Sequence, residues 1–469
     1  MKFYSKSLFL DQFTPVSIYS KIKEIFPNEI KFLFESNVNS NSGNYSYIII
    51  GSRERIWHVN DKSYFQNEDK SIKQIDDNPL IYLKKYYKNF DQITFKNEAN
   101  SLGIGFIDGF IGNIGYDMVK EFEPKLKSHM KNLKDEFNVY DLDLIRPKMV
   151  LCFSHKSSKL TIVTSMKDYS HNIITVENIL KSNHDYIPFK KAILKDSGKF
   201  NFSKEYFFKL VDEAKDMIKS GDIFQILLSN RFTQYGFVDH FSFYRVLRSN
   251  NPSPYLFFLE YEDFSIAGSS PEVMVKLTDD KILLRPIAGA RKRGKTLSKD
   301  IFFEKEMLND EKEKAEHLML VDLGRNDLSR VALDSSVKVT DFMRVERYSH
   351  VMHMVSDVEA TLDTKYDMFD LFMSTFTAGT MTGTPKIRAM ELIAKFEKLK
   401  RGFYSGSICY FGFDGNMDSA ITIRTTYLTK DKVIFQAGAG IVIDSKKELE
   451  YLEINNKLAA NIKSLNDMV

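Results

Sequence analysis

The sequence predicts an α+β fold of large, mainly antiparallel β-sheets in one very large domain or two. One observation supports the fold class and a second supports the size of the domains. Strand-like runs are numerous but do not alternate regularly with helix-like runs, which disfavours the parallel sheet of an α/β protein. The chain has 469 residues, more than one hydrophobic core usually organises, and 43% of them are apolar. The apolar content therefore suffices for one very large domain or two.

A change in residue composition and motif density gives the expected domain boundary. The stretch from Asn183 to Ser203 carries several Lys, Asp and Gly residues. It separates a weakly patterned part, residues 1–183, from a part that is dense in motifs, residues 203–465. We therefore predict one domain on each side.

The second part opens with a clear helix signal. Ser203 can cap the N-terminus, apolar residues follow a spacing of 3.6, and Gly221 can end the helix. A strand is expected over 223–232, with Gln225, Ser229 and Arg231 on a polar face opposite a packed apolar face. Further strands are expected over 253–261, 281–284, 407–413, 420–426 and 432–437, and further helices over 302–320, 366–372, 386–395 and 447–465.

Composition excludes several classes of protein. Lys plus Arg number 66 and Asp plus Glu number 63, so the one-sided basic surplus of a nucleic-acid binder is missing. Cys152 and Cys409 cannot form a disulfide framework, which favours a reducing, intracellular compartment. The apolar patch Leu8–Leu10 is too short for a signal peptide, and no run approaches the length of a membrane helix. We expect a cytoplasmic protein that binds neither nucleic acid nor membrane.

Two predicted helices carry glutamates at a spacing of three. Glu313 and Glu316 form one pair, and Glu450 and Glu453 form the other. Residues three apart share a helix face, and carboxylate oxygens are the ligands that Mg²⁺ prefers. Glu-rich helices are more often solvated surface, but apolar neighbours beside each pair indicate partial burial. The pairs therefore form a candidate Mg²⁺ site.

One histidine pair is a candidate for proton transfer. His353 lies in the segment RYSHVMHMVS, and an imidazole can exchange protons near neutral pH. A lone histidine among apolar residues is more often a hydrogen-bonded core residue. His350 is three residues away, so the spacing alone does not decide which of the two is functional.

Two glycine-rich segments and one arginine can serve a ligand that carries carboxylates. The segment 376–388 runs into a helix that Pro385 can start, and backbone amides at a helix N-terminus suit an anion. The segment 436–440, QAGAG, lets a ligand approach the backbone closely, although alone it would be a tight turn. Arg424 is expected on a strand and can bind a carboxylate in bidentate fashion.

Several motifs together carry a family resemblance. They are GDIFQILLSNRF, NPSPYLFF, RPIAGARKRG, AEHLMLVDLGRNDLSRVA, YSHVMHMVS, FTAGTMTGTPKIRAME, FDGNMDSAITIRT and QAGAGIVIDSKKELEYLEINNK. In this order they resemble the chorismate-utilising enzymes, and the anthranilate synthase component I branch in particular, over roughly residues 203 to 465. The first 180 residues match chiefly through KFLFES. The resemblance implies an α+β fold of stacked large antiparallel sheets flanked by helices, and a requirement for Mg²⁺.

The resemblance also implies roles for individual residues. Glu316 and Glu453 would bind Mg²⁺, supported by Glu313 and Glu450, and the metal would hold the ring carboxylate of chorismate. His353 matches the catalytic histidine. Gly289 and Ala290 would contact the ring, and the enolpyruvyl side chain would be held by Tyr404, Arg424, Gly438, Ala439 and Gly440. Thr380 and Lys457 are further active-site positions.

Two positions favour ammonia as the nucleophile. Isochorismate and salicylate synthases carry a water-activating lysine where this chain has Gln225, and an amide cannot act as that base. Aminodeoxychorismate synthases commonly carry a nucleophilic lysine where this chain has Ala288. The expected products are anthranilate and pyruvate, in the first step of tryptophan biosynthesis. The chain departs from the family pattern at Ala290, where threonine is usual, and in TGTPK, where SGAPK is common.

Two alternatives remain open. Some aminodeoxychorismate synthase component I proteins lack the lysine, so the para-substituted product of the folate pathway is a second possible product. A catalytically silent, tryptophan-binding paralogue is the other alternative.

The resemblance further implies regulation by tryptophan and a partner subunit. The inhibitor-binding residues would be Glu35, Ser36, Pro254, Tyr255 and Leu256. The alternative interpretation is a structural turn with two prolines. Both cysteines lie in strand-like runs rather than on the glycine-flanked turn that exposes a nucleophilic sulfur. Glutamine hydrolysis is therefore expected from a separate amidotransferase subunit.

Overall fold

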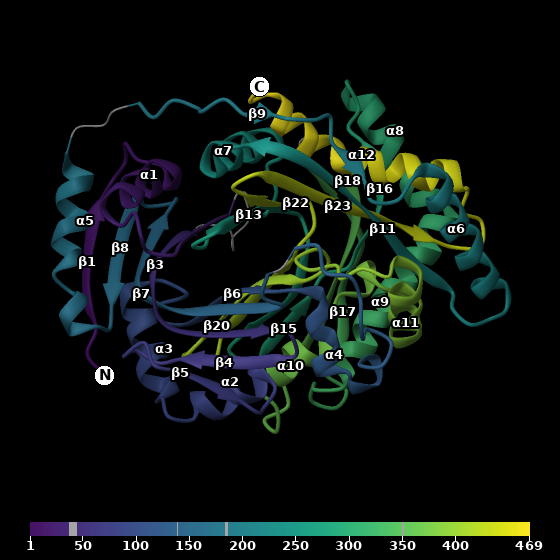
Figure 1. The fold of residues 1–469 in the computed structure, drawn as a ribbon. Coiled ribbons are helices and arrows are strands. Elements are labelled where there is room, and N and C mark those ends of the chain that lie inside the picture. The colour runs from purple at the N-terminus through teal and green to yellow at the C-terminus, as the bar shows by residue number, and fades with distance from the viewer. Residues whose placement is uncertain (37–44, 138, 183–185, 349–350) are drawn as a thin grey trace.

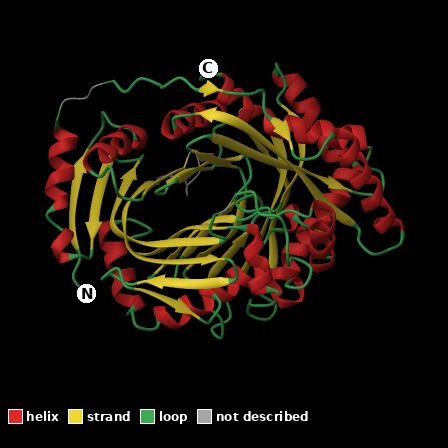
Figure 2. Cartoon of the chain, viewed as in Figure 1, coloured by secondary structure: helices red, strands yellow, loops and turns green. Residues whose placement is uncertain are grey.

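The computed structural model describes residues 1–36, 45–137, 139–182, 186–348 and 351–469. Within these residues the strands join into one hydrogen-bonded network, and every pair of strands in it is antiparallel. Strands gather in the middle of the molecule and helices cover the outside (Figures 1 and 2). The predicted α+β class is confirmed.

The α-helices in the described residues are α1 (Pro15–Ile25), α2 (Pro79–Tyr87), α3 (Gln92–Leu102), α4 (Val119–Phe122), α5 (Asn172–Lys181), α6 (Lys204–Lys219), α7 (His240–Asn250), α8 (Leu297–Asn309), α9 (Glu311–Ser329), α10 (Met368–Thr375), α11 (Lys386–Glu397) and α12 (Lys447–Asn466). None of these helices is both long and apolar enough to cross a membrane.

The strands of the first half are β1 (Tyr4–Phe9), β2 (Lys31–Ser36), β3 (Tyr45–Val59), β4 (Lys62–Gln66), β5 (Ile72–Ile75), β6 (Gly109–Ile114), β7 (Leu142–Ser154), β8 (Lys159–Thr164), β9 (Ile193–Leu194) and β10 (Lys199–Phe200). Those of the second half are β11 (Gln225–Phe237), β12 (Tyr255–Glu260), β13 (Phe264–Ser270), β14 (Val273–Thr278), β15 (Lys281–Leu284), β16 (Ile287–Lys292), β17 (Lys338–Arg347), β18 (Val351–Thr361), β19 (Gly383–Thr384), β20 (Ser407–Gly412), β21 (Met417–Ile421), β22 (Thr425–Thr429) and β23 (Lys432–Ile441).

Strand pairing crosses the predicted domain boundary twice. β2 pairs with β12 over six residues, from Ser36 opposite Tyr255 to Lys31 opposite Glu260. β6 pairs with β20, from Ile114 opposite Ser407 to Gly109 opposite Gly412. The division into 1–183 and 203–465 remains a prediction, and the hydrogen-bonded network runs through both parts.

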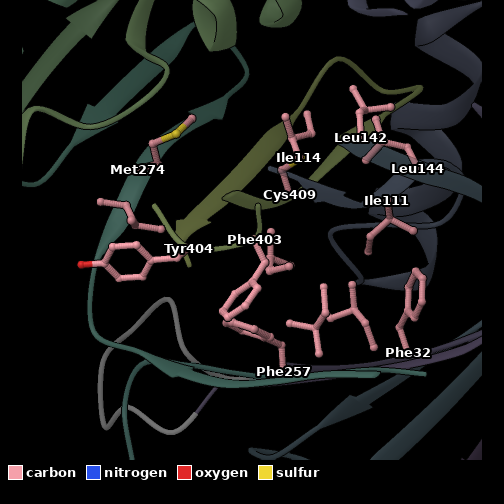
Figure 3. Packing of buried hydrophobic residues seen from close by; sticks show 14 of the residues in the cluster. Phe32, Ile111, Ile114, Leu142, Leu144, Phe257, Met274, Phe403, Tyr404 and Cys409 are labelled. Atoms are coloured by element: carbon pink, nitrogen blue, oxygen red, sulfur yellow. The ribbon is translucent and has the colours of Figure 1, made fainter. Parts of the chain in front are cut away.

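A single apolar core joins residues that are far apart in the sequence. Figure 3 shows Phe32 and Ile111 from the first half facing the same interior as Phe257 and Phe403 from the second. Phe32 and Phe257 are at most 1% exposed, and burying a side chain of this size contributes about 1.5 to 3 kcal/mol. The interior therefore fixes the two halves to each other, and with them the strands that carry the candidate site.

Several predicted elements are confirmed at close to their expected bounds. α6 begins after Ser203, whose hydroxyl accepts a hydrogen bond from the backbone of Tyr206 at 3.2 Å. α11 begins directly after Pro385, and β15 has the predicted bounds. Capping chemistry and helical periodicity are local signals, so they survive in the tertiary structure.

Other predicted elements are wrong in a specific way. The helix expected over 302–320 is two helices, because Asp310 interrupts it and caps α9 by accepting from the backbone of Lys312 at 3.0 Å. The strand expected over 420–426 is broken into β21 and β22, and Arg424 between them has φ 51°. The strand expected over 432–437 continues to Ile441, so the segment 436–440 is the end of β23 and the alternative interpretation as a tight turn does not apply. β11 is buried on both faces over its first eight residues, because it lies between packed layers.

Candidate active site

Two helices bring the predicted glutamates into one electrostatic field. Glu313 and Glu316 lie in α9, and Glu450 and Glu453 lie in the first two turns of α12. Burial, and after it the neighbouring charges of Glu313 and Glu453, together raise the pKa of Glu316 to about 7. Burial and the charge of Glu453 also raise the pKa of Glu450. The carboxylates repel one another, so the site favours an added cation.

Three side chains offset part of this negative charge. Arg291 on β16 donates from Nη1 to Glu313 Oε1 at 2.8 Å. Lys457 Nζ lies 2.6 Å from Glu453 Oε1, one helical turn away on α12. Gln225 Nε2, at the start of β11, donates weakly to Glu316 Oε1 at 3.4 Å. Glu313 and Glu453 thus have cationic partners, whereas Glu316 accepts its hydrogen bond from a neutral amide.

The donor set fits a hard divalent cation. All four side chains are carboxylates with oxygen ligands. The raised pKa of Glu316 reflects its burial first and the crowded negative charge of Glu313 and Glu453 second, and a bound cation would compensate both. Within the described ranges, the three-residue groups with ligand atoms all within 4.8 Å include only His58, Asp61 and Glu121, elsewhere in the chain. The glutamates are more widely spaced, which suits an ion such as Mg²⁺ that keeps part of its water shell.

His353 is held in one tautomer. Its Nδ1 lies 2.8 Å from the carbonyl oxygen of Gly289, which can only accept, so the neutral ring carries its proton on Nδ1. Nε2 is then free to accept a proton. Burial lowers the pKa of His353 to about 4, so the ring is neutral at pH 7. His350, the other histidine of the pair, lies outside the described residues.

Gly289 connects His353 to the glutamates. It has φ 65°, which favours glycine, and lies where the register of β16 against β18 shifts. A Cβ at Gly289 would lie 3.2 Å from Glu313 Oε2. The next residue, Ala290, pairs with His353 across the strands and is exposed. This bulge therefore sets the carbonyl that orients the imidazole.

The end of β23 forms a second wall of the site. A Cβ at Gly440 would lie 2.7 Å from Gln225 Nε2, and a Cβ at Gly438 would lie 3.0 Å from the hydroxyl of Tyr404. Lys457 Nζ donates to the carbonyl oxygen of Gly438 at 2.8 Å. Both glycines are needed for these close approaches. Ala439 is fully buried and, by strand alternation, points away from the face that Gly438 and Gly440 share.

Arg424 lies at the break between β21 and β22. Within the described part of the chain, its guanidinium makes no hydrogen bond and no ion pair, although burial lowers its pKa. The positive charge of Arg424 contributes to the lowered pKa of His353, so the two side chains share one region. An unpaired, largely desolvated guanidinium is suited to bind an incoming carboxylate.

Thr380 leads to a residue that the sequence analysis missed. Its hydroxyl donates to Glu272 Oε1 at 2.8 Å, from the short helix η4 (Gly379–Met381). Burial raises the pKa of Glu272 to about 8, while Thr380 and the charge of Lys457 act in the opposite direction. The available signal was an acidic residue in the otherwise uncharged run GSSPEVMV. Glu272 is a buried carboxyl that is protonated at neutral pH.

The five predicted inhibitor-site residues line a different cavity of about 800 Å³. The pairing of β2 with β12 brings them together, since Glu35 faces Leu256 and Ser36 faces Tyr255. The Glu35 carboxylate is fully satisfied. It accepts from Tyr244 Oη at 2.6 Å and from Arg248 at 2.8 Å and 2.9 Å. The cavity therefore has a neutralised polar end at Glu35. Its other walls combine apolar and proline residues with the charged side chains of Lys276, Arg285, Glu346, Arg347 and Asp418.

Comparison with known proteins gives one consistent family. Residues 29–463 match the family described as chorismate binding enzyme. The chain is 39% identical to anthranilate synthase component 1 of Aquifex aeolicus, with 98% of this chain and 93% of that protein aligned. It is 36% identical to the Thermus thermophilus protein of the same name, covering 98% and 97%.

Solved structures agree with the sequence comparisons. Anthranilate synthase component I from Streptococcus pneumoniae superposes with a TM-score of 0.78 at 32% identity, covering 91% of this chain and 94% of that one. The menaquinone-specific isochorismate synthase of Escherichia coli superposes with a TM-score of 0.73 at 17% identity, over 99% and 95%. The second similarity concerns the fold alone.

Proposed function

We propose that this chain, which belongs to the chorismate binding enzyme family, converts chorismate and ammonia to anthranilate, pyruvate and water as a first step of tryptophan biosynthesis. Similarity to proteins named anthranilate synthase component 1 over 98% of the chain supports the choice within the family. The observation that carries the proposal is the set of unsatisfied groups around one space. Repelling glutamates, the free guanidinium of Arg424 and the neutral His353 all belong to it.

Substrate binding follows from the charges. Arg424 would bind the carboxylate of the enolpyruvyl group, beside Tyr404 and the exposed backbone of Gly438 and Gly440. Glu316 and Glu453, with Glu313 and Glu450 beside them, would hold Mg²⁺. When bound, that ion supplies Lewis-acid polarisation and a positive charge opposite the ring carboxylate.

Proton handling would fall to two residues with different charge states. The reaction adds the ammonia nitrogen to the ring and releases the ring hydroxyl, which needs a proton to leave as water. Glu272, with a pKa of about 8, is protonated at pH 7 and can supply it. Loss of pyruvate then requires removal of a ring proton, and the free Nε2 of neutral His353 can accept it.

The nitrogen source would be a partner protein. Cys152 and Cys409 lie inside β7 and β20, and burial raises the pKa of Cys152 to about 12 and that of Cys409 well above its usual value. Neither thiol can form the thiolate that glutamine hydrolysis needs. A separate glutamine amidotransferase subunit would therefore deliver ammonia.

The isolated chain offers a direct test of this assignment. With chorismate and Mg²⁺ it should release pyruvate when ammonium salts are added, most readily at alkaline pH where free NH₃ is abundant. It should be inactive with glutamine as the nitrogen source until an amidotransferase subunit is added. Turnover from glutamine by the single chain would refute the division of labour, and no turnover with ammonium would favour the silent paralogue.

A second role, feedback inhibition by tryptophan, is favoured by the cavity around Glu35. Its volume of about 800 Å³ exceeds that of an indole side chain, and it is separate from the glutamates of the candidate active site. Tryptophan at saturating concentration should inhibit the wild-type enzyme. Indifference of the enzyme to tryptophan would remove this part of the proposal.

A further inference from the structure

Two buried oxygen atoms beside the glutamate cluster have no hydrogen-bond partner among the residues that the structure describes. They are Gln225 Oε1 and Thr384 Oγ1. Gln225 and Thr384 pair directly across β11 and β19, so their side chains leave the sheet on the same side, with Cβ atoms about 4.5 to 5.5 Å apart. Buried polar atoms without a partner are rare in folded proteins, and each costs about 1 to 3 kcal/mol. Two on adjacent strands indicate a ligand.

The amide of Gln225 is oriented by the active site. Its Nε2 points to Glu316 Oε1 at 3.4 Å, and the planar geometry of the amide therefore turns Oε1 away from that carboxylate. Oε1 thus remains available as a neutral acceptor at the edge of the reaction space. Gln225 is only 3% exposed, so bulk water does not satisfy this oxygen.

Thr384 pairs with Gln225 and also lines a groove behind the candidate active site. The groove has a volume of about 820 Å³ and lies between α9 and α11, which are adjacent in Figure 1. Phe224, Ala315, Met319 and Leu323 line it together with Thr384. Ala315 and Phe224 directly precede Glu316 and Gln225 in the sequence, so the groove reaches the back of the glutamate site.

The groove favours a small neutral molecule. Its charged lining residues form ion pairs, Lys386 with Asp327 at 2.9 Å and Arg330 with Glu123 at 3.2 Å. Most of the remaining wall is apolar, and an unpaired ion would lose hydration there without compensation. Neutral ammonia loses far less than ammonium.

We propose that Gln225 Oε1 and Thr384 Oγ1 form the subsite that holds the ammonia nucleophile, and that ammonia reaches it through the groove between α9 and α11. Ammonia has three N–H donors and one lone pair. Two acceptors take two of the donors, and the lone pair stays free for the ring. This inference rests on the proposed function, and it assigns a role to Thr384, a position where the related motif SGAPK carries alanine.

Thr384→Val tests the subsite, because valine keeps the branched shape and removes the hydroxyl. The isolated chain is assayed with Mg²⁺, saturating chorismate and increasing ammonium at fixed pH. The KM for ammonia should rise about tenfold, because one hydrogen bond to ammonia is lost. The KM for chorismate should change less than about twofold. Thr384→Ser restores a hydroxyl and should return the KM for ammonia toward the wild-type value.

A purely structural threonine gives a different result. The hydroxyl has no partner in the protein, so Thr384→Val should not lower Tm, whereas loss of a structural hydrogen bond would. An unchanged KM for ammonia, or an equal rise in the KM for chorismate, would overturn the subsite. Wild-type protein that makes no product from ammonium would instead refute the proposed function.

Narrowing the groove tests the route. Met319→Trp places a larger ring in the wall and should lower kcat/KM for ammonia several-fold at unchanged KM for chorismate. Ile174→Trp, on the exposed face of α5, is the matched control for an added tryptophan. Equal values of kcat/KM for ammonia in the two variants would exclude the groove as the path.

Discussion

The two cavities differ in how their buried charges are compensated. At Glu35 the carboxylate accepts hydrogen bonds from Tyr244 and from both donors of Arg248, so its charge is neutralised within the protein. Around Glu316 the carboxylates repel one another, and Arg424 has no acidic partner in the described residues.

This difference separates binding from chemistry. Unsatisfied charges and shifted pKa values are costly for folding, and they are retained where a substrate or metal completes them. A neutralised cavity can select a ligand by shape without acting on it. We therefore expect substitutions at the glutamates to change turnover, and substitutions at the Glu35 cavity to change inhibition.

The largest effect is expected at the glutamates. Glu316→Ala and Glu453→Ala should each lower turnover about 1000-fold, because each removes one ligand of a shared cation. Tm in the absence of Mg²⁺ should not fall, since the substitution relieves repulsion. Glu311→Ala is the matched control, on the same helix with a side chain 86% exposed. Substantial turnover of either variant with Mg²⁺ present would contradict the metal site.

The next effect concerns proton transfer. His353→Ala should lower kcat about 100-fold at unchanged Tm. Because the pKa of His353 is about 4, the wild-type rate at saturating Mg²⁺ should not fall between pH 7 and pH 5 once corrected for free NH₃. Above pH 8 the corrected rate should fall as Glu272 loses its proton, and Glu272→Gln should abolish that fall. A corrected rate that keeps rising through pH 9 would exclude Glu272 as the acid.

A smaller effect is expected at the second cavity. Ser36→Phe should fill part of it and raise the tryptophan concentration needed for half-inhibition about tenfold or more, with kcat near that of the wild type. Ser157→Phe, on an exposed turn, controls for an added phenylalanine. Equal inhibition of both variants would separate this cavity from regulation.

The smallest effect is on stability. The pKa values of Glu316 and Glu272 are raised from 4.5 to about 7 and about 8, so the folded state binds more protons than the unfolded state between these limits. Stability without Mg²⁺ should therefore fall as pH rises from about 4.5 to 8 and level off above. Saturating Mg²⁺ should raise Tm by about 2 to 4 °C at pH 8, and less at pH 5. A larger increase in Tm by Mg²⁺ at pH 5 than at pH 8 would contradict this prediction.

Local signals in the sequence predicted much of the fold and part of the site. Ser203 and Pro385 mark helix starts correctly, because capping depends on neighbouring residues alone. The break at Arg424 and the strand at Gly438 depend on contacts with distant strands, so no local pattern revealed them.

The candidate site shows the same difference between local signals and contacts that only the fold creates. The glutamate pairs were visible from their helical spacing, whereas Glu272 and Thr384 each stand alone in the sequence and gain meaning from Thr380 and Gln225 across the fold. Spacing left His350 and His353 equivalent, and the family resemblance separated them.

Product identity decides the proposed activity. The isolated chain would be incubated with chorismate, Mg²⁺ and ¹⁵N-ammonium. The products would be separated by chromatography and identified by mass spectrometry. The expected result is ortho-aminobenzoate that carries one ¹⁵N, with an equal amount of pyruvate. Aminodeoxychorismate, a para-substituted amine or an unlabelled isomer of chorismate would contradict the proposed function.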